Sequence, residues 1–457
     1  MIEPDVKKEL VALVGSDRYI DQPEVLTCYA YDSFAEEAMP EAVVFPLSTE
    51  EVAAIMRVAS REKIPVTARG AGTSVSGGPV PVRHGIVLCF SKMNKILSIS
   101  TRDRHVVVQP GVVNGDLQKA LAVHGFFYPP DPGSMNFSTI GGNVGHNAGG
   151  PRCLKYGVTV DYVMGMQVVL ASGKVVRFGS KNIKDVTGYN FSALYCGSEG
   201  TLGLVTEIIL RVVPKPETIQ TLLVTFDSLD NTATAVSDII GSGILPAAME
   251  LMDRMTVNAI EDSVRMGLPR EAEGTLLIEV DGTREACDRE REQIIAKVRE
   301  HGAVTVEEAH TEQDRNRLWA ARRAAYGVFA KIAPNIVSED VTVPVSRVPE
   351  MIRKIVEITG RYKLRAGVLA HAGDGNMHPL VCTDRANQAE WERAEKAFAE
   401  IFQAAAEMEG TLSGEHGIGL AKAQYMPLVV DQDTRDFMAL IKHAVDPDNI
   451  LNPGKFV

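Results

Sequence analysis

Arg69-Gly-Ala-Gly-Thr-Ser-Val-Ser-Gly-Gly78 contains four glycines in ten residues and directly follows a predicted strand at residues 64–68. Glycine has no Cβ, so backbone N–H groups can approach and surround phosphate oxygens there. The stretch is not a P-loop, because no Gly-Lys-Ser or Gly-Lys-Thr ends it. It is not a Rossmann fingerprint, because Val75 replaces the third glycine, and Pro79 and Pro81 block the following helix. Taken alone, it also fits a glycine-rich surface loop.

Two further glycine-rich stretches lie downstream. Asp131-Pro-Gly-Ser134 leads to Thr139-Ile-Gly-Gly-Asn-Val-Gly-His-Asn-Ala-Gly-Gly150, which contains five glycines. That density is far above the usual glycine content of about 7%. Gly197-Ser-Glu-Gly-Thr-Leu-Gly203 precedes an apolar strand. Three such loops in one domain predict a large ligand that is contacted along its length, such as a dinucleotide.

The C-terminal half carries a different pattern. His371-Ala-Gly-Asp-Gly-Asn-Met-His378 lies between short apolar runs at residues 366–370 and 379–382, which predict two strand ends. Glu415 and His416 lie further along the chain in another glycine-rich loop, Ser-Gly-Glu-His-Gly-Ile-Gly. Two imidazoles and one carboxylate form a three-ligand set for a divalent metal with open coordination positions. The alternative is a pair of core histidines in a glycine turn, but the loop that contains Glu415 and His416 favours the metal.

Length and composition exclude several classes of protein. A chain of 457 residues predicts two domains. The net charge of −12 and the absence of a basic block argue against nucleic-acid binding. No apolar run is long enough to span a membrane, and the charged N-terminus is not a secretory signal. The six cysteines are scattered without a CxxC, which argues against an iron–sulfur cluster and against disulfides, so a reducing cytoplasm is expected.

Periodicity and capping residues place the main elements. Ser48-Thr-Glu-Glu51 is a capping box that opens a helix. Helices are predicted at residues 3–14, 48–61, 114–123, 229–240, 283–301, 311–330 and 388–408. Strands are predicted at residues 64–68, 85–90, 105–108, 163–170, 174–178, 204–213, 221–226 and 274–280. Pro214-Lys-Pro216 is a predicted break, beyond which strands and helices alternate as in an α+β domain.

The glycine-rich loops and the histidine motif together resemble a known family. Residues 38–216 resemble the FAD-binding domain of the vanillyl-alcohol oxidase flavoproteins, and residues 217–457 resemble their C-terminal cap. Over nearly its whole length the chain resembles the FAD subunit of glycolate oxidase and the related D-lactate and D-2-hydroxyglutarate dehydrogenases. The resemblance implies an α+β fold: an N-terminal helical segment (residues 1–37), an FAD-binding domain of two subdomains, and an α+β cap with an antiparallel sheet.

The resemblance also assigns the residues that would bind FAD. The pyrophosphate would be held by Arg69, Gly70, Ala71, Gly72, Thr73, Ser74, Gly77 and Gly78. The flavin and its ribityl chain would be lined by Pro132, Gly133, Ser134, Thr139, Gly142, Asn143 and His146. The adenine end would contact Glu199, Gly203 and Val205, and Asn452 in Leu-Asn-Pro-Gly-Lys would lie near the ring. Some relatives attach the flavin covalently through a histidine in the first loop; Thr73 and Ser74 occupy that stretch here, so non-covalent FAD is expected.

By the same resemblance the chain would be a metal-assisted dehydrogenase of a D-2-hydroxy acid. His371, His378 and Glu415 would bind Zn²⁺ or Mn²⁺, and His416 would take the hydroxyl proton. Hydride would pass from C2 of the substrate to flavin N5. Arg322 matches the arginine that binds the substrate carboxylate, although with Arg323 beside it a solvated helix face is equally compatible. Relatives selective for a longer diacid have a polar residue where Leu380 stands, which favours a monocarboxylate such as lactate or glycolate.

No NAD site is evident, so reduced flavin must pass its electrons elsewhere. The resemblance implies an iron–sulfur subunit, an electron-transfer flavoprotein, a cytochrome or a quinone as acceptor. The expected location is the cytoplasm, with attachment to the inner membrane through a partner, and a homodimer is left open.

Three alternatives compete with this interpretation. Alkylglycerone-phosphate synthases share the fold and are non-redox transferases, but they carry a run of consecutive histidines that is absent here. A flavin-binding accessory subunit without substrate chemistry should lack the metal motif. A purely structural metal usually has four protein ligands, often cysteines, rather than an open set of three.

Overall fold

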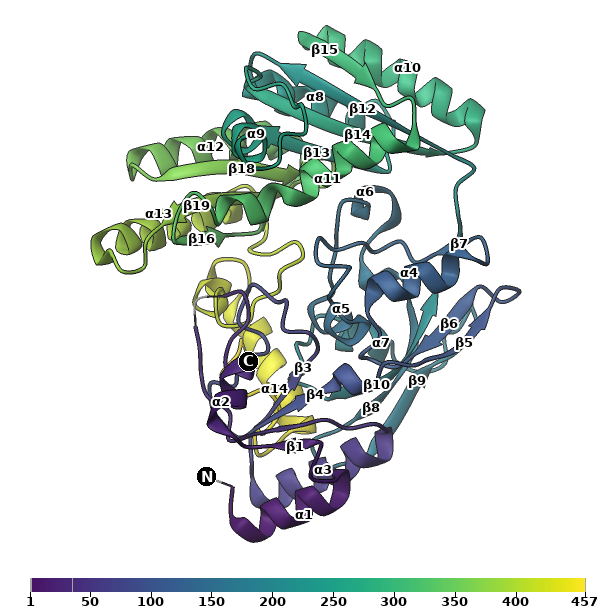
Figure 1. Ribbon diagram of the computed structural model, residues 1–457, viewed down its shortest axis with the longest axis vertical. Coiled ribbons are helices and arrows are strands. Elements are labelled where there is room, and N and C mark those ends of the chain that lie inside the picture. The colour runs from purple at the N-terminus through teal and green to yellow at the C-terminus, as the bar shows by residue number, and fades with distance from the viewer. Residues whose placement is uncertain (1, 35, 457) are drawn as a thin grey trace. The chain divides into compact units, whose positions relative to one another are not determined.

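The computed structural model describes residues 2–34 and 36–456, which form two compact units (Figure 1). Unit 1 consists of Met1–Gly149, Val158–Lys215 and Glu415–Val457. Unit 2 consists of Gly150–Gly157 and Pro216–Gly414. The chain therefore crosses between the units four times, and the last 43 residues return to the first unit.

The first layer of unit 1 is a four-stranded sheet in the order β1-β2-β4-β3, in which β2, β4 and β3 run parallel. Its strands are β1 (Tyr19–Ile20), β2 (Ala42–Val44), β3 (Val66–Arg69) and β4 (Ile86–Cys89). The helices of this part are α1 (Pro4–Val14), α2 (Pro23–Leu26) and α3 (Thr49–Glu62). Helix α3 begins at Ser48, whose hydroxyl accepts a hydrogen bond from the N–H of Glu51 as the capping box predicted. Its buried face joins Ile55 and Met56 to the core over the sheet.

The second layer of unit 1 is an antiparallel sheet of five strands in the order β5-β6-β10-β8-β9. Its strands are β5 (Ile96–Ser100), β6 (His105–Val108), β8 (Val163–Val169), β9 (Val175–Gly179) and β10 (Leu204–Arg211). A short pair, β7 (Phe126–Phe127) and β11 (Val213–Pro214), lies beside it. Helices α4 (Asn114–Ala122), α5 (Ile140–His146), α7 (Phe191–Tyr195) and the C-terminal α14 (Gln432–Val445) complete the unit.

Unit 2 is built on one eight-stranded sheet in the order β15-β12-β14-β13-β18-β19-β16, with β17 also paired to β19. All its pairings are antiparallel. The strands are β12 (Thr218–Phe226), β13 (Ala248–Asp253), β14 (Gly274–Gly282), β15 (Ala303–Glu308), β16 (Asn335–Ser338), β17 (Val341–Thr342), β18 (Arg365–His371) and β19 (Asn376–Thr383).

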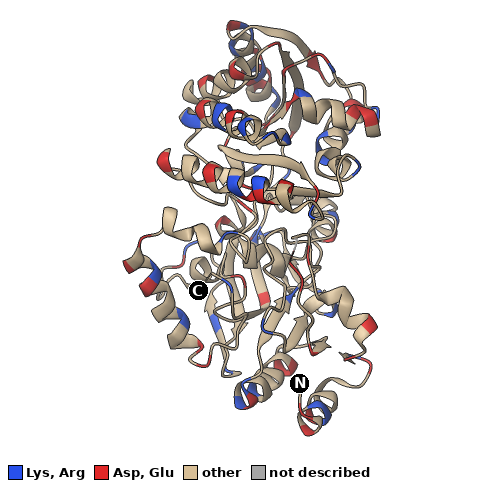
Figure 2. Ribbon diagram, turned by 90° about the vertical axis from the view of Figure 1, so that its left-hand side faces the viewer, with Lys and Arg blue, Asp and Glu red and all other residues tan. Residues whose placement is uncertain are grey.

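The helices of unit 2 pack as two groups on this sheet (Figure 1). One group contains α8 (Leu229–Gly241), α10 (Arg284–Glu300), α12 (Val348–Arg361) and α13 (Gln388–Glu407). The other contains α9 (Arg254–Ser263) and α11 (Glu312–Phe329), while the short α6 (Cys153–Tyr156) contacts β13. Leu318, Trp319 and Phe329 of α11 share a buried cluster with Leu369 and Leu380 of the sheet. In Figure 2, basic and acidic residues are interspersed along these helices, consistent with the absence of a basic block.

Most predicted elements are present within one to three residues of their predicted ends, and unit 2 has the predicted antiparallel sheet. One prediction was wrong. Residues 139–150 were predicted as a loop, yet they contain helix α5, because Thr139 caps its start and Asn147 closes it in the left-handed conformation. The predicted break at Pro214-Lys-Pro216 is present: Pro214 ends strand β11, and Lys215 and Pro216 lie outside any strand, before β12.

The predicted domain boundaries, after residues 37 and 216, stay predictions. The compact units follow a different division, because the segment after Gly414 is counted with unit 1. Within the described part of the chain, every helix is too short or too polar to cross a membrane.

Candidate functional site

The first two glycine-rich loops of unit 1 lie against each other. A Cβ added to Gly70 would lie 2.2 Å from Oγ1 of Thr139, and one added to Gly78 would lie 2.7 Å from Cε1 of His146. Neither approach is possible for a larger residue without a shift of the neighbouring side chain. The glycines are therefore required by the close contact of two segments that the sequence assigned to the same ligand.

The third loop and the C-terminal tail join this arrangement. The side-chain amide of Asn452 donates to the backbone oxygens of Gly78 (3.0 Å) and Glu199 (2.7 Å). The carboxylate of Glu199 accepts hydrogen bonds from the N–H groups of Ile418 (2.8 Å) and Gly419 (3.0 Å). Four residues predicted to bind FAD, one from each glycine-rich segment and one from the tail, are thus brought together within unit 1.

Two buried polar atoms in this region fit a ligand with hydrogen-bonding edges. Nδ1 of His146 and Oδ1 of Asn452 have no hydrogen-bond partner among the described residues. A buried polar atom without a partner is costly, so each calls for a group that the protein itself does not supply. An FAD molecule carries such groups along its ring, ribityl chain and phosphates, and the residues present fit it.

Other predicted FAD residues have roles inside the protein. Arg69 is buried, donates to the backbone oxygen of Tyr31 (2.8 Å), and has a pKa lowered by burial. Asn143 is hydrogen-bonded to Asn114 and Ser138. The rest of the set lies on the same loops or at the start of β10, where Gly203 packs against Val168; their contacts with FAD stay a prediction: Ala71, Gly72, Thr73, Ser74, Gly77, Pro132, Gly133, Ser134, Gly142 and Val205.

In unit 2, the two motif histidines lie on adjacent strands. His371 ends β18, His378 lies in β19, and the register pairs Leu369 with His378. Their ring centroids are 5.1 Å apart at 88°, and their ligand atoms lie within 4.8 Å of one another. The turn between them needs its glycine, because Gly375 has a φ of +84° and an added Cβ would lie 2.0 Å from the backbone oxygen of Val343.

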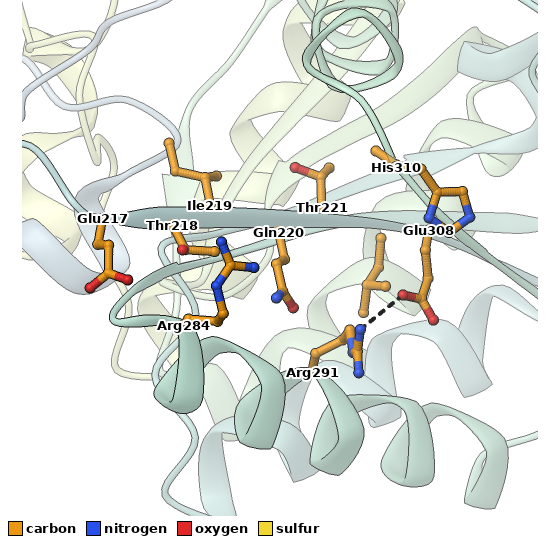
Figure 3. Close-up of a pocket in the computed structure, with 11 residues that line it drawn as sticks. Glu217, Thr218, Ile219, Gln220, Thr221, Arg284, Arg291, Glu308 and His310 are labelled. Atoms are coloured by element: carbon orange, nitrogen blue, oxygen red, sulfur yellow. Dashed lines mark hydrogen bonds and ion pairs between the residues drawn. The ribbon is translucent and has the colours of Figure 1, made fainter.

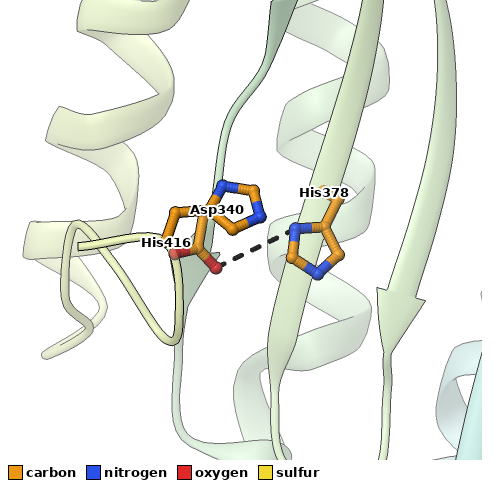
Figure 4. A group of neighbouring side chains, drawn as sticks. All are labelled: Asp340, His378 and His416. Atoms are coloured by element: carbon orange, nitrogen blue, oxygen red, sulfur yellow. Dashed lines mark ion pairs between the residues drawn. The ribbon is translucent and has the colours of Figure 1, made fainter. Parts of the chain in front are cut away.

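Each of these histidines faces an acceptor with its Nδ1 atom. Nδ1 of His371 lies 2.7 Å from the carboxylate of Glu250. Nδ1 of His378 lies 3.3 Å from the backbone oxygen of Glu339 and 3.9 Å from Asp340 (Figure 4). Acceptors at Nδ1 favour the tautomer protonated there, in which Nε2 carries the lone pair that a metal requires. The donor chemistry of the two rings therefore fits a divalent metal.

Arg322 points from α11 into the same cluster. Its Nη2 atom lies 2.5 Å from the carboxylate of Glu250, its side chain is only 10% exposed, and its Nε has no hydrogen-bond partner among the described residues. Burial alone would raise the pKa of Glu250, but Arg322 and His371 outweigh it and hold that pKa below its ordinary value. Arg323 is exposed. Of the two arginines, Arg322 is thus the one placed beside the histidines.

Glu250 and Asp340 were missed by sequence reasoning. Glu250 is fully buried on β13, opposite His371 in the strand register, yet 121 residues away along the chain. Asp340 is also fully buried and accepts hydrogen bonds from Asn376 and Ser413, both at 2.6 Å. The available signal was an acid flanked on both sides by apolar residues, Ala-Met-Glu-Leu-Met, which points to a buried ion pair.

The residue before Glu415 and His416 is hydrogen-bonded within unit 2. The N–H of Gly414 donates to the backbone oxygen of Asp340 (3.2 Å). Glu415 and His416 are the next two residues along the chain and belong to unit 1. There the backbone oxygen of His416 accepts a hydrogen bond from Oγ of Ser76 (3.0 Å), in the first glycine-rich loop. Leu380 is fully buried on β19, two residues after His378.

A separate hollow in unit 2 contains none of the predicted site residues. It has a volume of about 410 Å³ and lies between the start of β12, helix α10 and the end of β15 (Figure 3). Its charges oppose one another, since Arg291 donates to Glu308 (3.2 Å) and Arg284 shares the wall with Glu217. This hollow does not select a ligand of one charge.

Family models match both parts of the chain. A model described as "FAD binding domain" matches residues 40–179, and one described as "FAD linked oxidases, C-terminal domain" matches residues 215–456. The chain therefore belongs to the FAD-linked oxidases and is a flavin-dependent oxidoreductase. This confirms the family, the enzyme class and the FAD cofactor that the resemblance implied.

Curated relatives are similar over almost their full length. "Glycolate oxidase subunit GlcD" of Bacillus subtilis is 45% identical over 100% of this chain and 97% of the relative. The protein of the same name from Escherichia coli K12 is 39% identical over 92% of this chain and 84% of its own length. "D-lactate dehydrogenase" of Anaerostipes hadrus is 35% identical over 97% and 95%.

Solved structures confirm the predicted fold class. A p-cresol methylhydroxylase structure superposes with a TM-score of 0.82 at 19% identity, over 99% of this chain and 96% of that one. An alkyldihydroxyacetonephosphate synthase has a TM-score of 0.78 at 19% identity, over 99% and 86%. At these identities the likeness is one of fold alone.

Proposed function

We propose that this chain oxidises a D-2-hydroxy acid, lactate or glycolate above all, to the 2-oxo acid. The carrying observation is the cluster in unit 2: two buried histidines, each with an acceptor at Nδ1, beside a buried arginine with an unused Nε–H. Relatives named glycolate oxidase subunit and D-lactate dehydrogenase support this class of substrate. A hydroxy acid offers a hydroxyl that a metal can bind and a carboxylate that an arginine can bind.

The roles follow from the chemistry of each group. FAD, when bound, supplies the hydride acceptor, and a divalent metal, Zn²⁺ or Mn²⁺, would lower the pKa of the substrate hydroxyl. His371, His378 and Glu415 would hold the metal. Arg322 would hold the substrate carboxylate through its planar donors. His416 would take the hydroxyl proton on a ring nitrogen, the usual task of a neutral imidazole near pH 7.

The FAD would be held without a covalent bond. The first glycine-rich loop contains Thr73 and Ser74 rather than a histidine, so it offers no imidazole to the flavin. Acid precipitation should therefore release all the flavin into the supernatant. Yellow colour retained by the precipitated chain would contradict this part of the proposal.

The electrons would leave through another molecule rather than NAD. Two relatives are named as subunits of glycolate oxidase, and one from Arabidopsis thaliana is named "D-lactate dehydrogenase [cytochrome], mitochondrial". We infer an acceptor of that kind: an iron–sulfur subunit, an electron-transfer flavoprotein, a cytochrome or a quinone. The chain would act in the cytoplasm, at the inner membrane only through such a partner. The fold likeness to a transferase, at 19% identity, does not favour a non-redox reaction.

A substrate panel tests the proposal directly. Reduction of an artificial dye would be followed with D-lactate, L-lactate, glycolate and D-2-hydroxyglutarate, before chelation, after chelation and after return of Zn²⁺ or Mn²⁺. We expect turnover of a D-2-hydroxy monocarboxylate that chelation abolishes and metal restores, with FAD bound throughout. Full turnover in a sample shown by elemental analysis to be metal-free would defeat the metal assignment, and no turnover with any acid would defeat the substrate class.

A further inference from the structure

Glu250 occupies an unusual position for an acid. It lies on β13, an inner strand of the unit 2 sheet, with no exposed surface. A buried carboxylate requires partners, since an uncompensated charge in the interior is strongly destabilising. Its two oxygens contact two partners that come from different elements of the unit, and Oε2 lies near both.

The first partner is His371 on the adjacent strand. Oε1 lies 2.7 Å and Oε2 3.0 Å from Nδ1 of the ring, and the register places the two residues directly opposite each other. A carboxylate in this place fixes both the orientation of the imidazole and the position of its proton. The other ring nitrogen, Nε2, is then the one that carries the lone pair.

The second partner is Arg322 on α11. Its Nη2 lies 2.5 Å from Oε2 of Glu250, which fixes the plane of the guanidinium. The contact uses one edge of the group, and Nε has no partner among the residues that the structure describes. A planar group fixed at one edge presents its remaining donors in a defined direction, as carboxylate recognition requires.

We propose that Glu250 is a positioning residue that acts on both ends of the substrate at once: it sets the metal-binding tautomer of His371 and the orientation of Arg322. This rests on the proposed function, because it assigns His371 to the metal and Arg322 to the substrate carboxylate. Glu250 itself would contact neither the metal nor the substrate. It would orient a metal ligand through a hydrogen bond, and it would orient the neighbouring arginine in the same way.

The substitution Glu250→Gln tests this with little change of shape. Glutamine keeps one acceptor oxygen but replaces the other with an NH₂ group. If the oxygen stays with Arg322, the NH₂ faces Nδ1 of His371 and favours the tautomer protonated at Nε2. We expect Zn²⁺ affinity, measured by equilibrium dialysis and elemental analysis, to fall about 10- to 100-fold, the usual loss for an outer partner of a ligand. The KM for the hydroxy acid should rise more than kcat falls at saturating metal.

Glu279→Gln is the matched control. Glu279 is also a buried glutamate, on the neighbouring strand β14, and it accepts a hydrogen bond from Nε1 of Trp319 (2.7 Å) on the same helix α11. It contacts neither His371 nor Arg322 in any described hydrogen bond or ion pair. Glu279→Gln should therefore leave Zn²⁺ affinity and KM at the wild-type values. Equal losses in both variants would mean general loosening of the unit and would overturn the proposal.

A measurement on the unmodified protein keeps the proposal testable if Glu250→Gln fails to fold. Histidine labelled with ¹⁵N reports which ring nitrogen carries the proton, and His371 should be protonated at Nδ1 in the metal-free protein. Protonation at Nε2 would overturn the proposal. So would wild-type Zn²⁺ affinity and KM in Glu250→Gln. Failure of the proposed function is a separate result, namely a wild-type protein that binds no metal or oxidises no hydroxy acid.

Discussion

The glycine-rich loops of unit 1 and the histidine cluster of unit 2 are organised in opposite ways. In unit 1 the backbone determines the arrangement: Gly70 and Gly78 let segments approach to distances that a Cβ would forbid. In unit 2 the side chains determine it: Glu250 joins His371 and Arg322 from three separate elements. A loop surrounds a large cofactor with N–H groups, whereas a reaction at one carbon atom needs a few side chains at fixed angles.

This difference predicts that substitutions will separate two kinds of failure. Changes in the glycine-rich loops should reduce FAD content, with activity lost as a consequence. Changes in the histidine cluster or at His416 should leave the flavin spectrum intact and reduce turnover. A loop variant that keeps its FAD but loses turnover, or a cluster variant that loses its FAD, would show that the two regions are not separate in function.

The largest effect is expected for His416→Ala. Loss of a general base usually lowers kcat by about 10²-fold or more. Bound FAD should persist, because the link between His416 and the first glycine-rich loop is made by its backbone oxygen, which alanine keeps. Stopped-flow reduction of the flavin and its absorbance spectrum measure the two effects in one sample.

The control for this substitution is His443→Ala, which removes an exposed histidine of α14 from the same unit. It should leave kcat unchanged. A His416→Ala protein with wild-type kcat would remove the assigned base. A His416→Ala protein that loses its FAD would contradict the separation of cofactor binding from catalysis between the two regions.

Arg322→Lys should produce the next largest effect. Lysine keeps the positive charge beside Glu250 but lacks the planar donors that bind a carboxylate at two points. We expect KM for the hydroxy acid to rise by about tenfold, with a smaller change in kcat, as for loss of a charge-assisted contact. Arg323→Lys, at the exposed neighbour, is the matched control. Equal kcat/KM in the two variants would place the carboxylate anchor elsewhere.

The sequence predicted most of the features that depend on neighbouring residues and missed those that depend on residues far apart in the chain. Glycine enrichment is local, so the three loops and their common ligand could be identified before the fold was known. The pair His371 and His378 could also be found, because a short turn joins them. Glu250 could not, because strand pairing brings it opposite His371 from 121 residues away, and one sequence carries no record of that register. Helix α5 was missed because capping and packing outweigh the low helix propensity of its glycines.

A smaller effect is expected for Gly70→Ala. Its Cβ would lie 2.2 Å from Oγ1 of Thr139, and moving that side chain would weaken the cap on the N–H of Gly142 (3.3 Å). We expect a loss of about 1–3 kcal/mol in the free energy of unfolding, as for other overpacked contacts, together with lower FAD content per chain. Thermal unfolding and flavin absorbance measure both.

Gly360→Ala provides the comparison in unit 2. Gly360 is exposed in α12 with no atom within 4 Å of an added Cβ, so alanine there should be neutral or stabilise by up to about 1 kcal/mol. If Gly70→Ala behaves in the same way as Gly360→Ala, close backbone contact is not what the glycines of the first loop provide.

Strand β13 carries two acids, of which Glu250 is fully buried and Asp253 is half-buried. Glu250 faces Arg322 and His371 and has a lowered pKa, whereas burial raises the pKa of Asp253, the cap of α9, to about 6. A raised carboxyl pKa means that folding favours the protonated acid, so this stabilisation is complete below about pH 4 and is lost as the pH rises through about 6. An asparagine in place of Asp253 would keep the cap without the charge. Asp253→Asn should thus unfold at the wild-type urea concentration near pH 4 and gain about 1–3 kcal/mol relative to wild type by pH 7. A difference that stays constant across this range would show that Asp253 does not titrate there, and that its surroundings compensate its charge as those of Glu250 do.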